Sequence, residues 1–228
     1  MKRIIALIAF LLPICLRAQT LHLILIADTQ DRYVGETARK TIDYFKNNYA
    51  SLLKARMNLQ GKINILENTD FESVSITDTN PNDVIVFYYI GHGFNSDGSD
   101  DMFPVLEQKY KSILLSDVFN NLKYQSHKLL LVIAEASNTI RKSEISQQTP
   151  IIIPGQFPCG ENYIVSSSSR GQASYWNELG GLFTQSFFEA FESDTQLSWR
   201  NILDNTVSKT KQLAEEIGVI QTPQWEMN

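Results

Sequence analysis

Short runs of large aliphatic residues alternate with amphipathic stretches along this chain, and that alternation is typical of an α/β fold. Most of the runs are apolar throughout, as are strands that lie buried on both faces of a parallel sheet. We predict strands at Leu21–Ala27, Ile63–Leu66, Val84–Ile90, Leu129–Ile133 and Tyr163–Val165, with a small one at Phe103–Leu106.

Between the strands, apolar residues recur at the spacing of a helix that buries one face. We predict helices at Val34–Arg56, Ser116–Leu122, Leu182–Phe191 and Trp199–Glu216, with Ser116 as the N-cap of the second. This order of elements predicts a three-layer αβα sandwich around a mostly parallel sheet.

The remaining stretches are polar or rich in breaker residues, so we predict that they are connections. Asp70–Asp83 and Asn95–Asp101 are rich in Asp, Asn, Ser and Thr, and Ile140–Gly160 holds three prolines and two glycines. A loop as long as the last one is usually functional or mobile.

The first 18 residues resemble a secretory signal peptide, so we expect the folded domain to comprise residues 19–228. Lys2 and Arg3 precede the apolar run Ile4–Leu12, and Ala18 is a small residue at the expected cleavage position. The run is too short to span a bilayer comfortably. We predict export to the periplasm or beyond the cell, without a stable membrane span. The alternative is lipid attachment at Cys15, although the two residues before it are bulky for such a site.

Composition and charge narrow the possible partners. The chain has 228 residues, 43% hydrophobic and 20% charged, as expected for one ordinary globular domain. The formal net charge of the full chain is −5, and it becomes −8 when the three cationic residues of the leader are removed. An acidic chain without a block of basic residues argues against nucleic acid as the partner. Loss of Cys15 leaves Cys159 without an internal disulfide partner. We predict no cofactor and no metal site, and leave a dependence on calcium open.

Candidate chemistry lies where two of the predicted strands end. His92 stands between two glycines after Val84–Ile90, and Ser137 follows the strand Leu129–Ile133. Carboxyl ends of neighbouring parallel strands share one edge of the sheet, so a base and a nucleophile can meet there as a dyad. Simpler roles remain open: a turn for His92, a turn or helix cap for Ser137, and a local hydrogen bond for Glu135.

The segments around both residues resemble the caspase and metacaspase group of cysteine peptidases. Tyr89–Gly93 (YIGHG) is similar to the histidine motif, and Ala134–Asn138 (AEASN) to the nucleophile motif. The two positions are 45 residues apart, against about 50 in caspases. Further similar segments follow in the family's order and cover nearly all of the mature chain: Ile164–Ser169, Gly171–Tyr175, Gly180–Thr184 and Gln221–Gln224.

This resemblance implies roles for individual residues. His92 would handle protons, position 137 would attack the peptide carbonyl, and the backbone N–H groups of Gly93 and Ser137 would bind the oxyanion. The residues implied for substrate binding are Asp28, Glu135, Ser168, Arg170 and Gln172.

Two features of the implied site leave alternatives open. Glu135 and Asp28 favour a substrate with Lys or Arg at the cleavage position, whereas pairing of Arg170 with Glu135 would neutralise the pocket. Arg141 and Lys142 fall where many family members cut themselves, or else belong to an ordinary solvated loop.

Ser137 departs from the family, which has cysteine at this position. A hydroxyl needs much stronger activation than a thiol, so we expect little or no peptidase activity. Cys159 precedes the strand Tyr163–Val165 and does not supply the missing thiol. Because the leader is present, we interpret Ser137 as a natural change and not an engineered one. The alternatives are a non-catalytic module that binds a peptide or protein partner, and a serine hydrolase that uses Ser137 and His92.

Overall fold

The structure is a computed structural model that describes residues 19–67, 79–108, 111–142 and 160–228. The predicted signal peptide, with Cys15, lies outside the described residues, as do Cys159 and most of the long connection that begins at Ile140.

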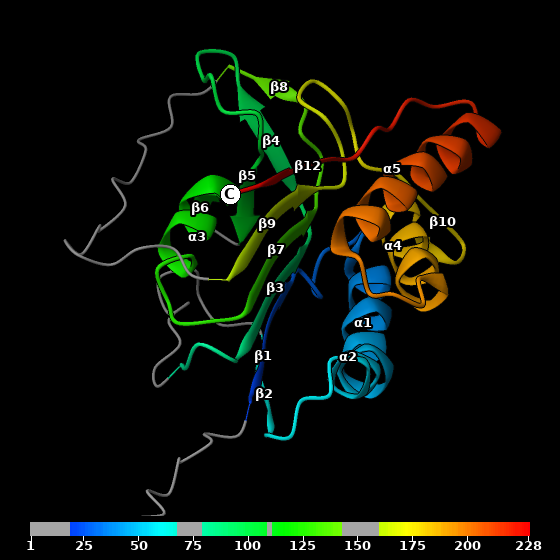
Figure 1. Ribbon diagram of the computed structural model, residues 1–228. Helices are drawn as coiled ribbons and strands as arrows, with labels where there is room; N and C mark the ends of the chain where they lie inside the picture. Colours follow the sequence, from blue (N-terminus) through cyan, green and yellow to red (C-terminus); the bar gives the residue numbers. More distant parts are fainter. Residues whose placement is uncertain (1–18, 68–78, 109–110, 143–159) are drawn as a thin grey trace, which may run out of the picture.

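A six-stranded sheet forms the centre of the fold (Figure 1). Its strands are β1 (Leu21–Ala27), β2 (Ile63–Glu67), β3 (Val84–Ile90), β7 (Leu129–Glu135), β9 (Glu161–Ser166) and β12 (Gln224–Met227). They lie in the order β12-β9-β7-β3-β1-β2, and each neighbouring pair is parallel except β12 with β9. Every residue of β1, β3 and β7 is buried, which explains why these three strands have almost entirely apolar sequences.

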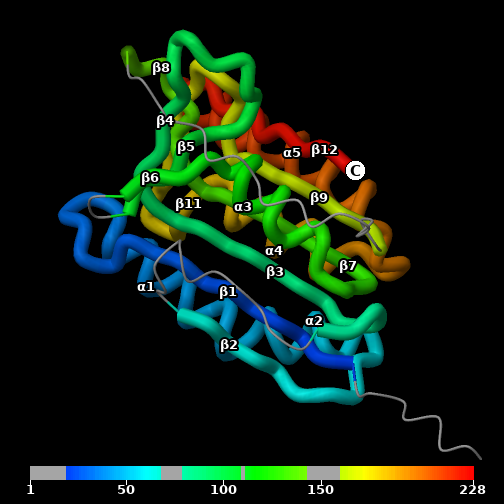
Figure 2. The backbone as a smooth tube through the Cα atoms, turned by 90° about the vertical axis from the view of Figure 1, so that its left-hand side faces the viewer, coloured from blue at the N-terminus to red at the C-terminus, as the bar shows by residue number. Residues whose placement is uncertain are grey.

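Helices cover both faces of this sheet, which confirms the three-layer prediction. One face carries α1 (Gly35–Tyr44), α2 (Ala50–Arg56), α4 (Leu182–Ser193) and α5 (Trp199–Glu216). The opposite face carries α3 (Leu115–Leu122), which lies in front of the sheet in Figure 2. The predicted helix Val34–Arg56 is interrupted by a π-helical turn, η1 (Phe45–Tyr49), between α1 and α2.

Alternation along each strand divides the core into two clusters. Tyr88 faces the layer of four helices, where its ring centroid lies 4.3 Å from that of Phe45. Phe87 and Tyr89, its neighbours in β3, face α3 on the other side. By the same period of two, Glu135 at the end of β7 points toward the four-helix side, the side of Tyr88.

A second, smaller sheet lies beyond the carboxyl ends of β3 and β7. It contains β4 (Gly93–Ser96), β5 (Val105–Gln108), β6 (Lys111–Leu114) and β8 (Ile140–Arg141), in the order β6-β5-β4-β8. A short hairpin, β10 (Trp176–Asn177) with β11 (Gly180–Gly181), stands before α4.

Several boundaries differ from the sequence prediction. Asn95 lies in β4 and not in a loop, because its buried Nδ2 donates to the carbonyls of Asp101 and Phe103 and to Asn138 Oδ1, at 2.9–3.1 Å. Ser116 lies inside α3, whose N-cap is Leu114, because its hydroxyl donates to Asp101 Oδ1 at 2.9 Å.

The sequence pattern also missed the short strands β6, β8, β10, β11 and β12. β8 occupies the first two residues of the predicted connection Ile140–Gly160 and pairs with β4. β12 consists of half-buried and exposed residues, so it lacks the apolar run that identifies the other strands.

A buried polar cluster fastens the starts of β1 and β3. The Asp83 carboxylate accepts hydrogen bonds from the backbone N–H groups of Thr20 (2.8 Å) and Asn80 (3.1 Å). It also lies 3.1 Å from His22 Nε2, and both side chains are buried. Asn80 Nδ2 also donates to this carboxylate, at 2.5 Å, so the buried group is satisfied by four donors.

Removing this carboxylate should destabilise the fold. In Asp83→Ala, two backbone donors and the His22 ring lose their partner inside the protein, which we expect to lower the free energy of unfolding by about 3 kcal/mol. Urea denaturation measures the change, with Asp43→Ala on the exposed face of α1 as the matched control. Equal stability of the two variants would contradict this role for Asp83.

Candidate active site

The turn after β3 brings His92 next to the loop that follows β7. A side chain at position 93 would place its Cβ 2.7 Å from the carbonyl oxygen of Ser137 and 2.8 Å from Ala136 Cβ, closer than real contacts allow. Glycine at this position therefore permits the close approach of the two strand ends. Gly93 opens β4 directly after His92.

The His92 side chain is held by a carboxylate from a third strand end. Its ring is 45% exposed, and Nε2 lies 2.9 Å from Oδ2 of Asp31, in the loop between β1 and α1. The other oxygen of Asp31 accepts the backbone N–H groups of Tyr33 (2.7 Å) and Val34 (2.8 Å). Sequence analysis missed Asp31, although the available signal was a carboxylate shortly after a buried strand.

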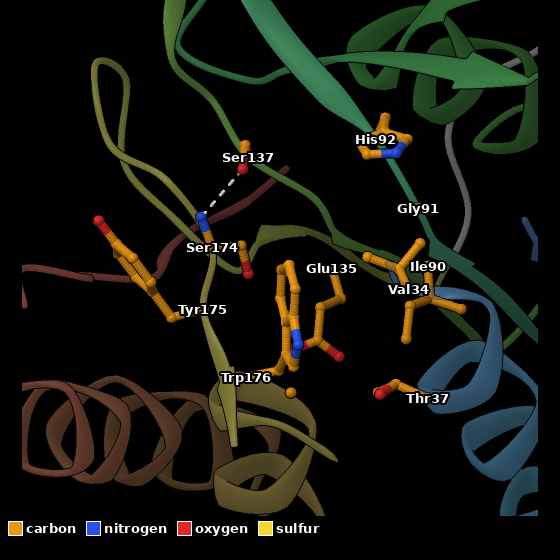
Figure 3. Close-up of a pocket in the computed structure, with 11 residues that line it drawn as sticks. Val34, Thr37, Ile90, Gly91, His92, Glu135, Ser137, Ser174, Tyr175 and Trp176 are labelled. Carbon is orange, nitrogen blue, oxygen red and sulfur yellow. Dashed lines mark hydrogen bonds between the residues drawn. The ribbon is translucent and has the colours of Figure 1, made fainter. Parts of the chain in front are cut away.

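Ser137 lies half-buried in the loop after β7. Its Oγ accepts a hydrogen bond from the backbone N–H of Ser174 at 3.2 Å, and Figure 3 shows the hydroxyl pointing toward Ser174. His92 and Ser137 line the same cavity, and no hydrogen bond joins these two described side chains. His92 and Ser137 therefore share one site, but each is hydrogen-bonded to another residue.

The backbone around both residues offers donors for an oxyanion. Within the described part of the chain, the N–H of Ser137 has no hydrogen-bond partner. The His92 carbonyl accepts from Glu107 N–H at 3.0 Å, which makes Gly93 and Leu106 a non-hydrogen-bonded pair of the antiparallel ladder. The N–H of Gly93 therefore points away from β5, toward the edge along which the loop of Ser137 runs.

The cavity has a volume of about 120 Å³ and opens between the strand ends, α1 and the hairpin (Figure 3). Trp176, 46% exposed, forms one wall, and Thr37 of α1 lies opposite. Among the residues that the structure describes, its lining consists of Val34, Thr37, Ile90, Gly91, His92, Glu135, Ser137, Ser174, Tyr175, Trp176 and Gly181. Glu135 is thus the only carboxylate among mostly small and apolar neighbours.

Glu135 is buried, with 5% exposure. It accepts hydrogen bonds from the Thr184 hydroxyl, from Thr184 N–H (3.5 Å) and from Tyr88 O–H (3.4 Å). A Cβ on Gly181 would lie 1.7 Å from Glu135 Oε1, so only glycine leaves room for the carboxylate. Burial raises the pKa of Glu135 to about 7 despite these hydrogen bonds.

Arg170 does not neutralise Glu135. Its guanidinium donates to the carbonyl oxygens of Ser96 (3.1 Å) and Ser99 (2.8 Å), at the end of β4. The alternative in which Arg170 pairs with Glu135 is therefore wrong, because backbone carbonyls that were not visible in the sequence pattern compete for the cation.

Three other residues implied for substrate binding lie outside the cavity lining. The buried Ser168 hydroxyl donates to the Ala136 carbonyl at 3.0 Å. Gln172 Oε1 accepts from Thr222 N–H at 2.7 Å, and its carbonyl accepts from Asn138 N–H at 2.9 Å. Both residues shape the loop of Ser137. Asp28, whose N–H donates to the Ile90 carbonyl at 3.1 Å, joins the ends of β1 and β3.

Arg141 and Lys142 differ in their surroundings. Arg141 ends β8, and its guanidinium contacts both carboxylate oxygens of Glu107 (2.9 and 3.0 Å) and lies 4.6 Å from the centroid of the Phe94 ring. Lys142 is exposed and directly precedes the undescribed residues 143–159. Cleavage at these residues stays a prediction.

The described residues contain no group of three or more His, Cys, Asp or Glu side chains able to hold a metal ion. In the same part of the chain, no helix is long and apolar enough to cross a membrane.

Comparisons with known proteins point to one family. The family model for the caspase domain matches residues 68–228. Caspase-1 from Spodoptera frugiperda has a similar structure, with a TM-score of 0.57 and 13% identity over 92% of this chain and 86% of that one. A protein from Geobacter sulfurreducens gives a TM-score of 0.54 and 13% identity over 92% and 93% of the respective chains. No curated protein sequence matches this chain.

The buried state of Glu135 predicts a pH dependence of stability. Its pKa of about 7 in the folded protein exceeds the ordinary value of 4.5, so the folded state holds the proton more tightly than the unfolded state. This contribution to stability is fully present below about pH 4 and is lost as pH rises through 7, a change of about 3 kcal/mol.

In Glu135→Gln, this part of the pH dependence should be absent. Urea denaturation between pH 5 and 8.5 measures the free energy of unfolding of the parent and of the variant. The difference between the two values should change with pH. The exposed Glu215→Gln serves as control and should follow the parent. Parallel curves for the parent and Glu135→Gln would rule out an uncharged Glu135 at low pH.

Proposed function

The chain belongs to the caspase-domain family, and from this premise we propose that it binds peptides as a peptidase homologue whose cutting is strongly impaired. The observation that carries the proposal is the buried Glu135 carboxylate in a cavity that His92 and Ser137 also line. The proposed ligand is a peptide or protein segment with Lys or Arg at the position that enters this cavity.

The chemistry of the cavity favours a basic side chain. Arg170 is engaged elsewhere, so among the lining residues only His92 is able to carry a positive charge. An entering ammonium or guanidinium group would stabilise the ionised form of Glu135 and offset the cost of its burial. The apolar walls suit the methylene stem of Lys or Arg, and the exposed Trp176 ring offers a face for the cation.

Ser137 is the reason for expecting impaired cutting. A cysteine at this position is partly ionised near neutral pH, whereas a serine hydroxyl must lose its proton to a base during attack. Ser137 Oγ accepts a hydrogen bond from Ser174 N–H and makes none to His92, so in the unliganded site the two side chains must come together before that transfer. The same observation favours a second candidate, a module that holds peptides without cutting them.

Restoring the thiol should restore cutting. We expect Ser137→Cys in the mature chain to raise kcat/KM on fluorogenic Arg or Lys peptides at least about 100-fold over the parent, because a thiolate is intrinsically far more nucleophilic. Ser174→Cys, which puts a thiol elsewhere on the same cavity, is the matched control and should give no gain.

The same peptides separate the two candidates. Activity of Ser137→Cys on basic peptides supports the peptidase homologue, and its loss on adding Glu135→Gln supports the assigned pocket. Tight binding of immobilised basic peptides by parent and variant, without cutting by either, supports the binding module. Neither binding nor cutting would refute both.

We also propose that the chain is exported and that its leader is removed after Ala18. The support is the sequence itself, in which Lys2 and Arg3 precede the apolar run Ile4–Leu12. N-terminal sequencing of the protein recovered from the periplasm or culture fluid of an expressing bacterium should begin at Gln19. A lipid-modified Cys15 as the first residue would contradict this prediction.

A further inference from the structure

Asp31 has the environment of a fixed, charged carboxylate. Its side chain is 17% exposed, and its oxygens accept from His92 Nε2 (2.9 Å) and from the N–H groups of Tyr33 (2.7 Å) and Val34 (2.8 Å). Burial alone would raise the pKa of Asp31, but the hydrogen bonds from Val34, His92 and Tyr33 outweigh it and hold the pKa below its ordinary value. The residue precedes the segment that matches the caspase-domain model.

This carboxylate determines which nitrogen of His92 faces a reaction. An ionised carboxylate only accepts hydrogen bonds, so Nε2 must carry a proton, and Nδ1 of the neutral ring is left as the acceptor. Nδ1 has no hydrogen-bond partner within the described residues. Since the ring is 45% exposed, the bond to Asp31 is the contact that limits its rotation.

We propose that Asp31 is the positioning residue of a Ser137–His92–Asp31 arrangement that gives this site serine-type acyl-transfer chemistry. The inference deepens the proposed function and rests on its assignment of His92 as base and Ser137 as nucleophile. A hydroxyl nucleophile depends on an oriented base far more than a thiolate does, and in serine proteases loss of the carboxylate costs about 10⁴ in kcat.

The proposed steps assign one role to each of these groups around the shared cavity. Ser137 Oγ forms a bond to the acyl carbon while its proton passes to His92 Nδ1, and Asp31 stabilises the resulting imidazolium. The bond to the leaving amine then breaks, and the amine takes the proton from Nδ1, which leaves an ester on Ser137. Water hydrolyses the ester by the same proton path. The bond from Ser174 N–H uses Oγ as acceptor, so the hydroxyl proton stays available for Nδ1.

A fluorophosphonate probe tests the inference without a peptide substrate. Oγ displaces fluoride from phosphorus and loses its proton to His92, so the parent should be labelled at Ser137, as located by peptide mass mapping. Ser137→Ala and His92→Ala should not be labelled there. Asp31→Asn should lower the second-order rate of labelling at least about tenfold. Asp43→Asn on exposed α1 is the matched control and should react as the parent does.

The tautomer of His92 gives a readout that a merely structural role would leave unchanged. The chain has three histidines, so ¹⁵N spectra of the imidazoles are simple, and His92→Ala assigns the signal. The parent should show the Nε2–H form of the neutral ring, and Asp31→Asn should lose this preference. Unchanged signals of His22 and His127 show that the variant is folded.

The outcomes distinguish this inference from the proposed function. An unlabelled parent, or equal labelling and equal tautomers in the parent and Asp31→Asn, overturns the inference. If Ser137→Cys fails on basic peptides while Ser137 is labelled in an Asp31-dependent manner, the peptide function fails and the inference stands. If Ser137→Cys cuts basic peptides and the probe never reacts with the parent, the peptide function stands and the inference fails.

Discussion

A parallel sheet that is buried on both faces leaves polar side chains one place to gather, the edge where its strands end. Every residue of β1, β3 and β7 is buried, and each strand gives way to a polar segment at the same edge. Asp31, His92 and Ser137 come from these three segments, so residues far apart in sequence lie around one site. Burial of the strands thus determines where the chemistry is located.

Sequence reasoning predicted those features that depend on local pattern. The apolar runs identified the five parallel strands, and the polar tips after β3 and β7 contain His92 and Ser137, which line one cavity. It failed where a distant partner decides the outcome. Asn95 lies in a strand where carbonyls elsewhere in the chain accept from its Nδ2, and the Arg170 guanidinium donates to the carbonyls of Ser96 and Ser99. Hydrogen bonds of this range leave no periodic signal in a sequence.

In the proposed function, peptide recognition and bond cleavage depend on different groups of this site. Glu135 owes its properties to Tyr88, Thr184 and Gly181, which support it from β3, α4 and the hairpin. His92 owes its orientation to Asp31, which belongs to the loop after β1. If the proposed function holds, serine at position 137 affects bond cleavage and leaves peptide recognition in place. A family member with this replacement keeps a physical reason to retain its cavity.

The contact between Gly181 and Glu135 has a consequence for how such a pocket evolves. Any side chain at position 181 would overlap the carboxylate, and no shorter residue than glycine exists. A side chain at position 181 is accommodated only where the Glu135 carboxylate moves aside or position 135 carries a shorter residue. Variation at the two positions is therefore coupled, and the effect of a substitution at one depends on the residue at the other. Epistasis of this kind links the volume of the pocket to its charge.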